Sequence, residues 1–466
     1  MVRRERVSSG GYSAEPRAGP ERPGASRREQ ATVSALLDHV LDAARPSVKG
    51  HVARVVGLNL EIDGLQLPLG GSVRVSGAAG EVIAEVVAVH PDGLVCMPLG
   101  ELRGVRAGDI AEGADGATEV PVGSQLLGRV LDGLGRPIDG GPSLAQLPRV
   151  PVDHAAPHPL SRQMIRQALP LGVRALDTLV PCGRGQRMGI FAGSGVGKSS
   201  LLSMITRGTE ATVTVLALVG ERGREVREFI ENDLGPVGLA RSVVVVATSD
   251  EPALVRLRAA FTATRIAESF RDGGHDVLLL MDSLTRFAMA QREVGLSAGE
   301  PPATRGYPPS VFAMLPRLLE RAGASDTGSI TGLYTVLVEG DDLMDPIGDA
   351  SRAILDGHIV LSRALATSGH FPSIDVLDSI SRVGPAVTSV EQRRDATEMR
   401  RLLAAYRDAK DLIEIGAYVP GTNPLVDRAI HLREAMDGFL RQDLHESTPA
   451  SDAWAWLERL VGGASG

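Results

Sequence analysis

The sequence predicts an α/β protein with a mostly parallel sheet core, preceded by a small β-barrel and followed by a helical domain. Three observations carry this prediction. After a glycine-rich loop near Gly195, apolar β-branched runs alternate with amphipathic ones, as in strand–helix–strand units with parallel strands. Residues 48–115 contain short alternating runs broken by glycine, which favour a small closed barrel. Beyond Val383 strand signals fade and helical periodicity replaces them.

Composition limits the classes of function. The 466 residues suggest about three domains, and the net charge of -8 argues against a large basic surface for duplex nucleic acid. Aromatic residues make up 3% of the chain, which leaves little material for stacking bases. Cys96 and Cys182 lie far apart without a CxxC pair, so neither a zinc site nor a disulfide framework is expected. We therefore expect a reduced, cytoplasmic setting and no nucleic-acid partner.

The N-terminus begins with two predicted segments. Residues 1–30 are nearly empty of large apolar groups, so we expect a disordered tail. Its positive start has no apolar stretch after it, so we do not expect a signal peptide. Residues 31–47 place Val33, Leu37 and Val40 on one face of an amphipathic helix. Two interpretations stay open for this helix: packing on its own domain, or docking a partner.

Three domains are expected after the helix. Residues 48–115 form the β-barrel, for which few aromatics and mixed charge favour a packing or ring-forming role over oligonucleotide binding. Residues 116–385 form the nucleotide-binding domain. Residues 386–466 form the C-terminal helical domain, in which Met399, Leu402 and Leu403 mark one helix.

A phosphate-binding loop follows the apolar run that ends near residue 192. Its residues are Ala192, Gly193, Ser194, Gly195, Val196, Gly197, Lys198, Ser199 and Ser200. The glycines let successive N–H groups point inward, and the following helix presents its positive end to an anion. Lys198 is expected to reach the β- and γ-phosphates, and Ser199 to hold Mg²⁺. Ala192 departs from the usual first glycine of the GxxxxGK[ST] pattern.

Carboxylates are expected at the same sheet edge as the loop. Asp282 ends the all-apolar strand 277–281, at the edge where open α/β sheets bind ligands, which favours a metal-side role over a helix cap. Glu221 follows another apolar strand and can aim the attacking water, and Glu339 is an equally placed rival. Spacing alone does not decide between the two glutamates.

Several motifs together resemble the rotary ATPase superfamily. They are VGERGREV at 219–226, DSLTRF at 282–287 and GYPPSVF at 306–312. More narrowly, AGSGVGKS at 192–199, DEPALVR at 250–256, YTVLVEGDD at 334–342 and LDGHIVLSR at 355–363 resemble the type III protein-export ATPases, which also carry Ala at the first loop position. The match runs from about residue 30 to the C-terminus, and it implies a P-loop core of the RecA-like type.

The resemblance assigns roles by position. It implies that Glu221 polarises the hydrolytic water and that Arg222 lies near the γ-phosphate. Arg286 is similar to the arginine after the metal-side aspartate. Arg382, in the segment 379–384, is similar to an arginine finger delivered into the neighbouring subunit's site.

Two aromatic residues are also assigned by resemblance. Phe371 and Tyr418 are at positions similar to those that pack on adenine, with a plain core role as the alternative.

The same resemblance implies an assembly and partners. One chain holds both Glu221 and Arg382, so identical copies can close a ring, and a homohexamer that hydrolyses MgATP is expected. It would release, unfold and deliver substrates at the membrane export gate of a flagellum, the favoured branch, or of an injectisome. A negative regulator or stator would dock on residues 31–47, and the stalk protein, chaperones and export substrates would meet residues 386–466. The expected location is the cytoplasmic face of the export apparatus, with membrane association only through partners.

Two other enzyme classes compete with this hypothesis. A subunit of a rotary ATP synthase would co-purify with a distinct paired subunit. An RNA translocase resembling the transcription terminator Rho also pairs a small barrel with this core, and single-stranded RNA would stimulate it. The acidic balance and sparse aromatics weigh against the translocase.

Overall fold

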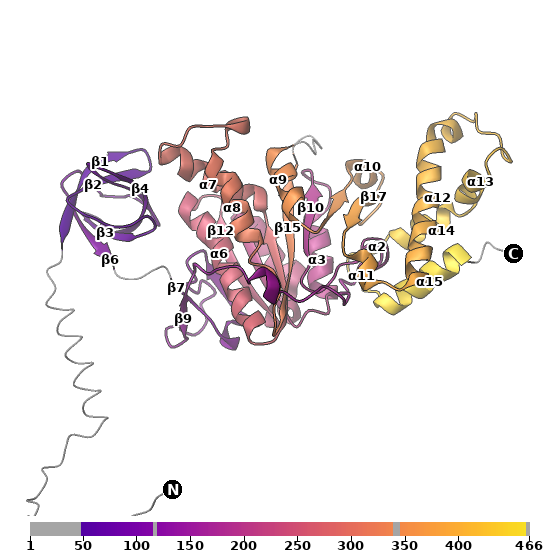
Figure 1. The fold of residues 1–466 in the computed structure, drawn as a ribbon, viewed down its shortest axis with the longest axis horizontal. Helices are drawn as coiled ribbons and strands as arrows, with labels where there is room; N and C mark the ends of the chain where they lie inside the picture. Colours follow the sequence, from indigo (N-terminus) through magenta and orange to yellow (C-terminus); the bar gives the residue numbers. More distant parts are fainter. Residues whose placement is uncertain (1–47, 115–118, 339–344, 463–466) are drawn as a thin grey trace, which may run out of the picture. The chain divides into compact units, whose positions relative to one another are not determined.

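The computed structural model describes residues 48–114, 119–338 and 345–462 (Figure 1). By its internal contacts the chain divides into Met1–Val48 and Lys49–Gly466, and the second unit holds almost all described residues. The predicted tail (1–30), the predicted helix (31–47) and Glu339 lie outside the described residues. No helix in the described ranges combines the length and apolar composition that a membrane span requires.

The first part of the second unit is a closed antiparallel barrel. Its strands are β1 (Lys49–Val56), β2 (Asn59–Asp63), β3 (Ser72–Gly77), β4 (Gly80–His90), β5 (Gly93–Pro98) and β6 (Ile110–Ala114). The strand order is β1-β2-β5-β4-β3-β6, and β6 pairs back onto β1. Val73 and Val75 are buried while Arg74 between them is exposed, the period-two alternation of a strand with one face in a core. The small barrel predicted from the sequence is confirmed.

The central sheet is nearly all parallel. Its order is β17-β16-β10-β15-β13-β11-β12-β8, with β14 paired to β15. The strands are β8 (Val130–Asp132), β10 (Arg187–Ala192), β11 (Val213–Glu221), β12 (Ser242–Thr248), β13 (Asp276–Asp282), β14 (Gly323–Ala324), β15 (Ser329–Leu337), β16 (Gly357–Leu361) and β17 (Ile374–Ser381). Only β14 and β17 pair antiparallel among these described strands. A separate two-stranded sheet is formed by β7 (Glu119–Pro121) and β9 (Arg149–Pro151), which flank β8 in the chain.

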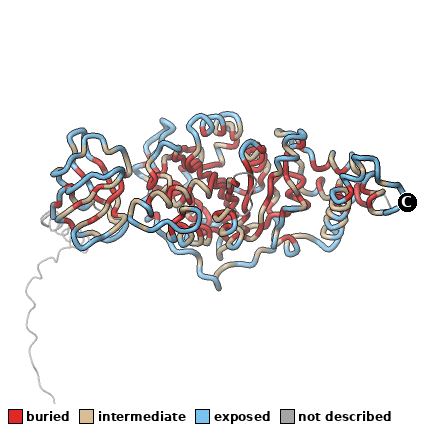
Figure 2. Tube along the Cα trace, turned by 90° about the horizontal axis from the view of Figure 1, so that it is seen from above, coloured by how far each residue is buried: buried red, intermediate tan, exposed pale blue. Residues whose placement is uncertain are grey.

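Helices cover both faces of this sheet, which explains why its strands are apolar without alternation. On β11, Val215 and Ala217 pack into one core cluster, while Leu216 and Leu218 pack into another on the opposite face. Figure 2 shows the buried residues concentrated in this region. The helices are α2 (Arg174–Leu179), α3 (Lys198–Gly208), α4 (Gly223–Glu228), α5 (Gly235–Ala240), α6 (Ala253–Asp272), α7 (Leu284–Ser297), α8 (Pro309–Leu319), α9 (Pro346–Ile354), α10 (Arg363–Thr367) and α11 (Gly384–Val387). Short helical turns are η1 (Ser124–Leu126), η2 (Pro159–Ser161), η3 (Phe229–Leu234) and η4 (Thr304–Gly306).

The chain ends in helices, as predicted. They are α12 (Val390–Glu414), α13 (Pro424–His431), α14 (Arg433–Leu440) and α15 (Ala450–Gly462). Ser389 and Gln392 form a capping box that starts α12. Phe439 meets Trp456 edge-on at 5.5 Å between ring centroids, and the guanidinium of Arg174 lies 4.8 Å from the Trp456 ring centroid. These contacts fix the terminal helices against α2. In the chain, α2 precedes β10, the strand that ends at the phosphate loop.

Removing the fully buried Phe439 ring should loosen this attachment. We expect Phe439→Ala to lower the free energy of unfolding by about 3 to 5 kcal/mol, because it deletes apolar burial and leaves a cavity. Chemical denaturation followed by tryptophan fluorescence measures this, since Trp456 is the neighbouring ring. Val237→Ala, at an 85% exposed side chain, is the control and should change it by less than about 0.5 kcal/mol. Equal effects of the two substitutions would contradict the packing described here.

Candidate active site

The phosphate loop connects the middle of the sheet to a helix. β10 lies between β15 and β16 and ends at Ala192, and α3 begins at Lys198. Gly195 and Gly197 have φ of 75° and 92°, in the left-handed region that favours glycine. A Cβ atom on Gly197 would also lie 3.4 Å from the Phe371 ring. The loop therefore requires glycine here on conformational grounds, and its N–H groups at the start of α3 are suited to an anion.

The segment after β16 supports the loop from outside. The Ser373 hydroxyl donates to the Val196 carbonyl oxygen at 2.5 Å, and Arg363 Nη1 donates to the Ser194 carbonyl oxygen at 3.2 Å. Phe371 lies against Gly197 with 46% of its surface exposed, so its ring borders the loop and is open on one side. The structure thus brings Phe371 to the loop.

Tyr418 lies elsewhere. It belongs to the connection between α12 and α13, where its hydroxyl is 2.9 Å from the Asp427 carboxylate and 3.1 Å from the Asn423 carbonyl oxygen. No hydrogen bond among the described residues joins it to the loop. The adenine role of Tyr418 stays a prediction.

Three charged side chains meet at the carboxyl ends of the parallel strands. Lys198 Nζ lies 2.5 Å from Asp282 Oδ1 and 3.5 Å from Glu221 Oε1. All three side chains are nearly enclosed, with 13%, 9% and 13% of their surface exposed. The sequence predicted that Lys198, Asp282 and Glu221 share this edge, and the structure brings them together because β10, β13 and β11 run in the same direction.

Enclosure and charge change the acidity of this cluster. Burial raises the pKa of Glu221 and the Asp282 charge adds to this, although Lys198 opposes both. Burial alone would lower the pKa of Lys198, but the carboxylates of Asp282 and Glu221 outweigh it and raise it. Lys198 therefore stays a cation, and the Glu221 carboxyl is a stronger base than a solvated glutamate.

Asp282 is held by a residue that sequence reasoning missed. Thr335 Oγ1 on β15 donates to Asp282 Oδ1 at 2.7 Å. The register pairs Met281 with Tyr334 and thereby puts Thr335 beside Asp282. A hydroxyl near the end of a buried strand was the available signal, but its partner depends on the register, which cannot be read from the sequence.

The residues present suit Mg²⁺ only together with a phosphate ligand. Across the described ranges no cluster of three or more His, Cys, Asp or Glu side chains could hold a metal ion. Mg²⁺ is typically bound by one or two carboxylates and by substrate phosphate oxygens. Asp282, and the exposed Ser199 hydroxyl in the first turn of α3, fit that pattern.

The two neighbouring arginines differ. Arg286 packs its stem over Gly220, where a Cβ atom would lie 3.0 Å from Arg286 Cβ, and its buried Nε has no hydrogen-bond partner among the described residues. This unpaired donor beside Glu221 suits an anionic ligand. Arg222 instead points into solvent, with 79% of its side chain exposed, and bonds to Glu225 at 3.3 Å. The structure does not bring Arg222 to the cluster within one chain.

Arg382 lies at the amino ends of the parallel strands, opposite the carboxyl ends that carry the charged cluster. It follows β17, whose Ser381 pairs with Gly357 at the start of β16, and its backbone N–H donates to the Asp356 carbonyl oxygen at 3.0 Å. Its exposed guanidinium donates to the Arg352 carbonyl oxygen at 3.3 Å. The phosphate loop begins at the other end of the neighbouring strand β10. One chain therefore does not place Arg382 at its own phosphate loop.

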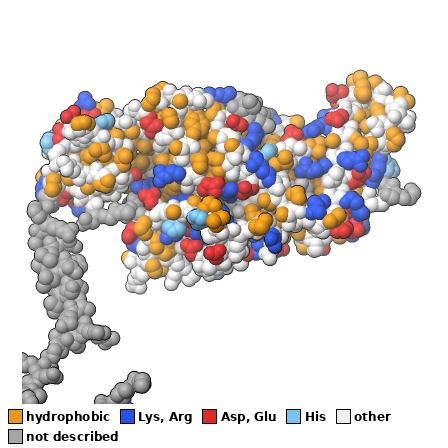
Figure 3. Space-filling view, in the orientation of Figure 1, with side chains coloured by type: hydrophobic (Ala, Val, Ile, Leu, Met, Phe, Trp, Pro, Cys, Tyr) orange, Lys and Arg blue, Asp and Glu red, His pale blue; other side chains and the backbone are white. Residues whose placement is uncertain are grey.

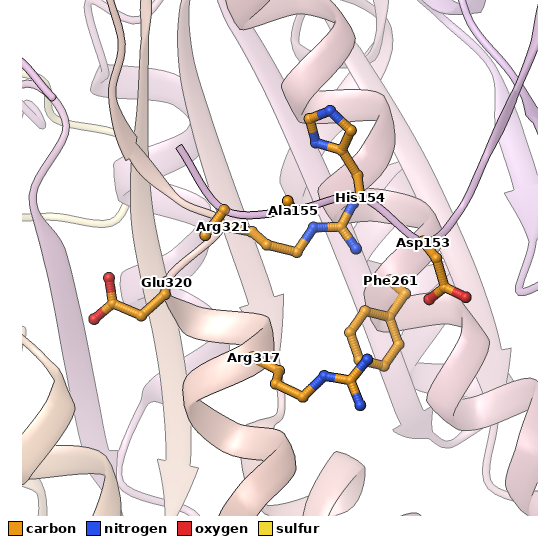
Figure 4. Close-up of a pocket in the computed structure, with 8 residues that line it drawn as sticks. Asp153, His154, Ala155, Phe261, Arg317, Glu320 and Arg321 are labelled. Carbon is orange, nitrogen blue, oxygen red and sulfur yellow. The ribbon is translucent and has the colours of Figure 1, made fainter. Parts of the chain in front are cut away.

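A cavity of about 470 Å³ lies away from this site (Figure 4). It is lined by Asp153, His154, Ala155, Ala156, Phe261, Arg317, Glu320 and Arg321. None of the predicted site residues lines it. Beside it, the buried Glu268 accepts two hydrogen bonds from Arg321 at 2.7 and 2.8 Å. Arg321 Nη1 also donates to the Val152 carbonyl oxygen at 3.1 Å, so this ion pair anchors the segment that follows β9.

The fold and site belong to a known class of nucleotide-binding proteins. Residues 172–381 match the ATP synthase alpha/beta family, nucleotide-binding domain, and residues 388–459 match the T3SS EscN ATPase C-terminal domain. The chain is thus a P-loop ATPase of the ATP synthase alpha/beta class, which confirms the predicted enzyme class, fold class and nucleotide substrate.

Comparisons over most of the chain identify the family within this class. The flagellum-specific ATP synthase of Bacillus subtilis is 51% identical, over 89% of this chain and 95% of the relative. The type 3 secretion system ATPase of Xanthomonas euvesicatoria is 51% identical, over 84% of this chain and 89% of the relative. The structure of the assembled ATPase EscN from enteropathogenic E. coli superimposes with a TM-score of 0.84 at 45% identity, covering 88% of this chain and 100% of EscN. The chain belongs to the family of flagellum-specific and type 3 secretion system ATPases, as its motifs predicted.

Loss of the Thr335 hydroxyl should weaken the hold on Asp282. We expect Thr335→Val to lower kcat for ATP about tenfold, because a hydrogen bond to a charged group contributes about 1.5 to 3 kcal/mol. Steady-state hydrolysis measures this, with the melting temperature as a check on folding. Thr335→Ser keeps the hydroxyl and should stay close to the unchanged protein. A Val variant as active as the Ser variant would contradict a role for this hydrogen bond.

The raised pKa of Glu221 predicts the acidic side of the pH profile. Only the ionised carboxylate can act as a base toward the attacking water, so kcat/KM should fall as the pH is lowered through a pKa above 4.5, the ordinary value for Glu. Arg286→Gln should move this limb to still higher pH, because the Arg286 charge lowers the pKa of Glu221. An acidic limb at or below pH 4.5, measured where circular dichroism is constant, would contradict the assignment.

The same shift has a consequence for stability. Because the folded state binds this proton more tightly than the unfolded chain, the contribution of Glu221 to stability is greatest at low pH. It is lost as pH rises through the folded pKa.

Proposed function

We propose that this chain hydrolyses MgATP in a closed ring of identical copies and drives protein export by a type III apparatus. The observation that carries this proposal is the separation of Arg382 from the phosphate loop of its own chain. Heterologous contacts that close by rotation put one edge of a subunit against the other edge of the next. In such a ring Arg382 of one copy faces the Lys198 loop of its neighbour, and a homohexamer is the proposed closure.

Each residue of the cluster then has a defined task. Lys198 would move from Asp282 to the β- and γ-phosphates, and Asp282 and Ser199 would hold Mg²⁺. Mg²⁺ supplies charge neutralisation between the phosphates when bound. Glu221 accepts a hydrogen bond from the attacking water and holds it in line with the γ-phosphate. Arg286 and the Arg382 of a neighbouring copy offset the charge that spreads over the transferring phosphoryl oxygens, and Phe371 borders the base. Arg222 would join them only by turning from solvent toward the loop.

The partners proposed for the ring are those of a protein-export motor. EscN has been solved in complex with its central stalk EscO, at a TM-score of 0.81 and 44% identity to this chain. We propose that a stalk protein, chaperones and export substrates meet the C-terminal helices. A regulator or stator would bind residues 31–47, and the ring would lie at the cytoplasmic face of the membrane through these partners. Deleting residues 1–47 without loss of regulator binding would contradict the docking role.

The flagellar branch is favoured over the injectisome branch. Flagellum-specific relatives at 50% identity or above cover 89% to 90% of this chain, against 81% to 84% for the secretion-system relatives at 51%. We therefore propose release, unfolding and delivery of flagellar export substrates.

The two competing enzyme classes make different demands. An RNA translocase needs a basic, base-stacking surface, but Figure 3 shows basic, acidic and apolar side chains interspersed on the face that it draws. Single-stranded RNA should therefore leave ATP turnover unchanged. A synthase subunit would need a different paired chain, whereas this chain carries both Glu221 and Arg382.

Glu221→Gln tests the catalytic assignment. It keeps the size of the side chain and removes the charge that orients water, so turnover should fall at least about a hundredfold while ATP still binds. Hydrolysis and nucleotide titration measure the two effects separately. Glu228→Gln, at a half-exposed glutamate nearby on α4, is the matched control and should retain turnover. An active Glu221→Gln protein would return the role of base to Glu339.

A further inference from the structure

A second polar cluster lies at the amino ends of β10 and β16. Arg187, the first residue of β10, donates from Nε and Nη2 to the Asp356 carboxylate at 3.1 and 3.2 Å. The Arg187 backbone N–H also donates to Asp356 Oδ2 at 3.1 Å. Glu320 pairs with Arg187 Nη1 at 2.5 Å. Burial opposes the charge of Arg187, but these hydrogen bonds and carboxylates outweigh it and raise its pKa. Asp356 is therefore bound to β10 by several charge-assisted hydrogen bonds.

Gln186 extends the cluster to the end of β17. It is fully buried, and its side-chain Nε2 donates to the Asp356 carbonyl oxygen and to the Ser381 hydroxyl, each at 3.1 Å. The Ser381 hydroxyl in turn donates to the Pro181 carbonyl oxygen at 2.7 Å. Gln186 thus links the start of β16 with the residue that precedes Arg382.

The backbone leaves little freedom at this point. Arg382 N–H donates to the same Asp356 carbonyl oxygen, at 3.0 Å. A Cβ atom on Gly357 would lie 2.4 Å from the Ile380 carbonyl oxygen, so β16 and β17 approach as closely as glycine allows. The Arg382 backbone is therefore fixed through Asp356, while its guanidinium stays exposed.

We infer that Asp356, held by Arg187 and Gln186, positions Arg382 for the nucleotide of a neighbouring copy. This inference rests on the proposed function, because it needs Arg382 to act between copies. A misplacement of about 1 Å can cost about a hundredfold in rate, so a residue that touches no nucleotide can still limit turnover. Asp356, Arg187 and Gln186 are then positioning residues, and Arg382 is the residue that meets the phosphates.

Mixed rings separate this role from a general loss of structure. Lys198→Ala copies cannot use their own site but still offer Arg382, whereas Asp356→Asn copies keep the loop and offer a misplaced arginine. Asp356→Asn alone should lower kcat at least about tenfold, with the KM for ATP within about twofold of the unchanged protein. When Asp356→Asn copies are mixed with Lys198→Ala copies, the ATPase activity of the mixture should exceed the sum of the activities of the two separate proteins. About a quarter of the sites in randomly mixed rings would then be complete.

Two further variants complete the experiment. Arg382→Ala should be rescued by Lys198→Ala in the same way as Asp356→Asn. Asp276→Asn is the matched control, because Asp276 pairs with Arg184 at the same sheet edge and is 32% exposed against 28% for Asp356, yet contacts nothing in the Arg382 segment. Its kcat should stay near that of the unchanged protein.

Each outcome has a distinct meaning. If Arg382→Ala is rescued while Asp356→Asn is fully active alone, or is not rescued, the positioning role is overturned. If Arg382→Ala itself is not rescued, the proposed action between copies is overturned. Rescue of both variants supports both claims.

Discussion

The close approach of Lys198 to Asp282 and Glu221 is the interaction on which the site depends. One ammonium group balances two carboxylates in a nearly enclosed space, where charges interact more strongly than in water. Under the proposed function this balance would change on binding of a nucleoside triphosphate with Mg²⁺, because Lys198 would then have phosphate oxygens as partners and Asp282 would be free to hold the metal ion. The strands β13 and β11 are buried along nearly their whole length and carry these carboxylates at their carboxyl ends.

The direction of β10 imposes the second constraint. Its six residues carry the phosphate loop at one end and the Arg187–Asp356 pair at the other, about 17 Å apart at about 3.3 Å per residue. Arg382 belongs to the second end. A chain with this topology has its phosphate loop at one end of the strands and Arg382 at the other, and in the proposed ring a neighbouring copy brings the two together. Under the proposed function, the same parallel order that assembles the carboxylates therefore makes catalysis depend on a neighbouring copy.

Sequence reasoning reached the loop, Asp282 and Glu221 because each lies at the end of an apolar strand, and parallel strands end at one edge, but it preferred Glu221 to Glu339 only through resemblance. It reached Arg382 only through resemblance, because nothing local distinguishes that arginine. Thr335 and Gln186 were missed because their roles depend on which strands are neighbours and in what register.

The directions of side chains and the pairing of the edge strand could not be predicted from the sequence either. Arg222 follows Glu221 directly but points into solvent as the N-cap residue of α4. Tyr418 is tied to Asp427 by hydrogen bonds that aromatic spacing does not reveal. The edge strand β8 pairs with β12, but its three residues are too few for the sequence to predict that pairing.

The central claim is that identical copies complete one another's sites. The most direct measurement is a cryo-electron microscopy structure of the assembled particle with Mg²⁺ and a non-hydrolysable ATP analogue. The account predicts the Arg382 guanidinium within hydrogen-bond distance of the phosphates gripped by Lys198 of the adjacent copy, with Lys198 released from Asp282. An Arg382 that still donates to the Arg352 carbonyl oxygen of its own chain while every site holds nucleotide would contradict it.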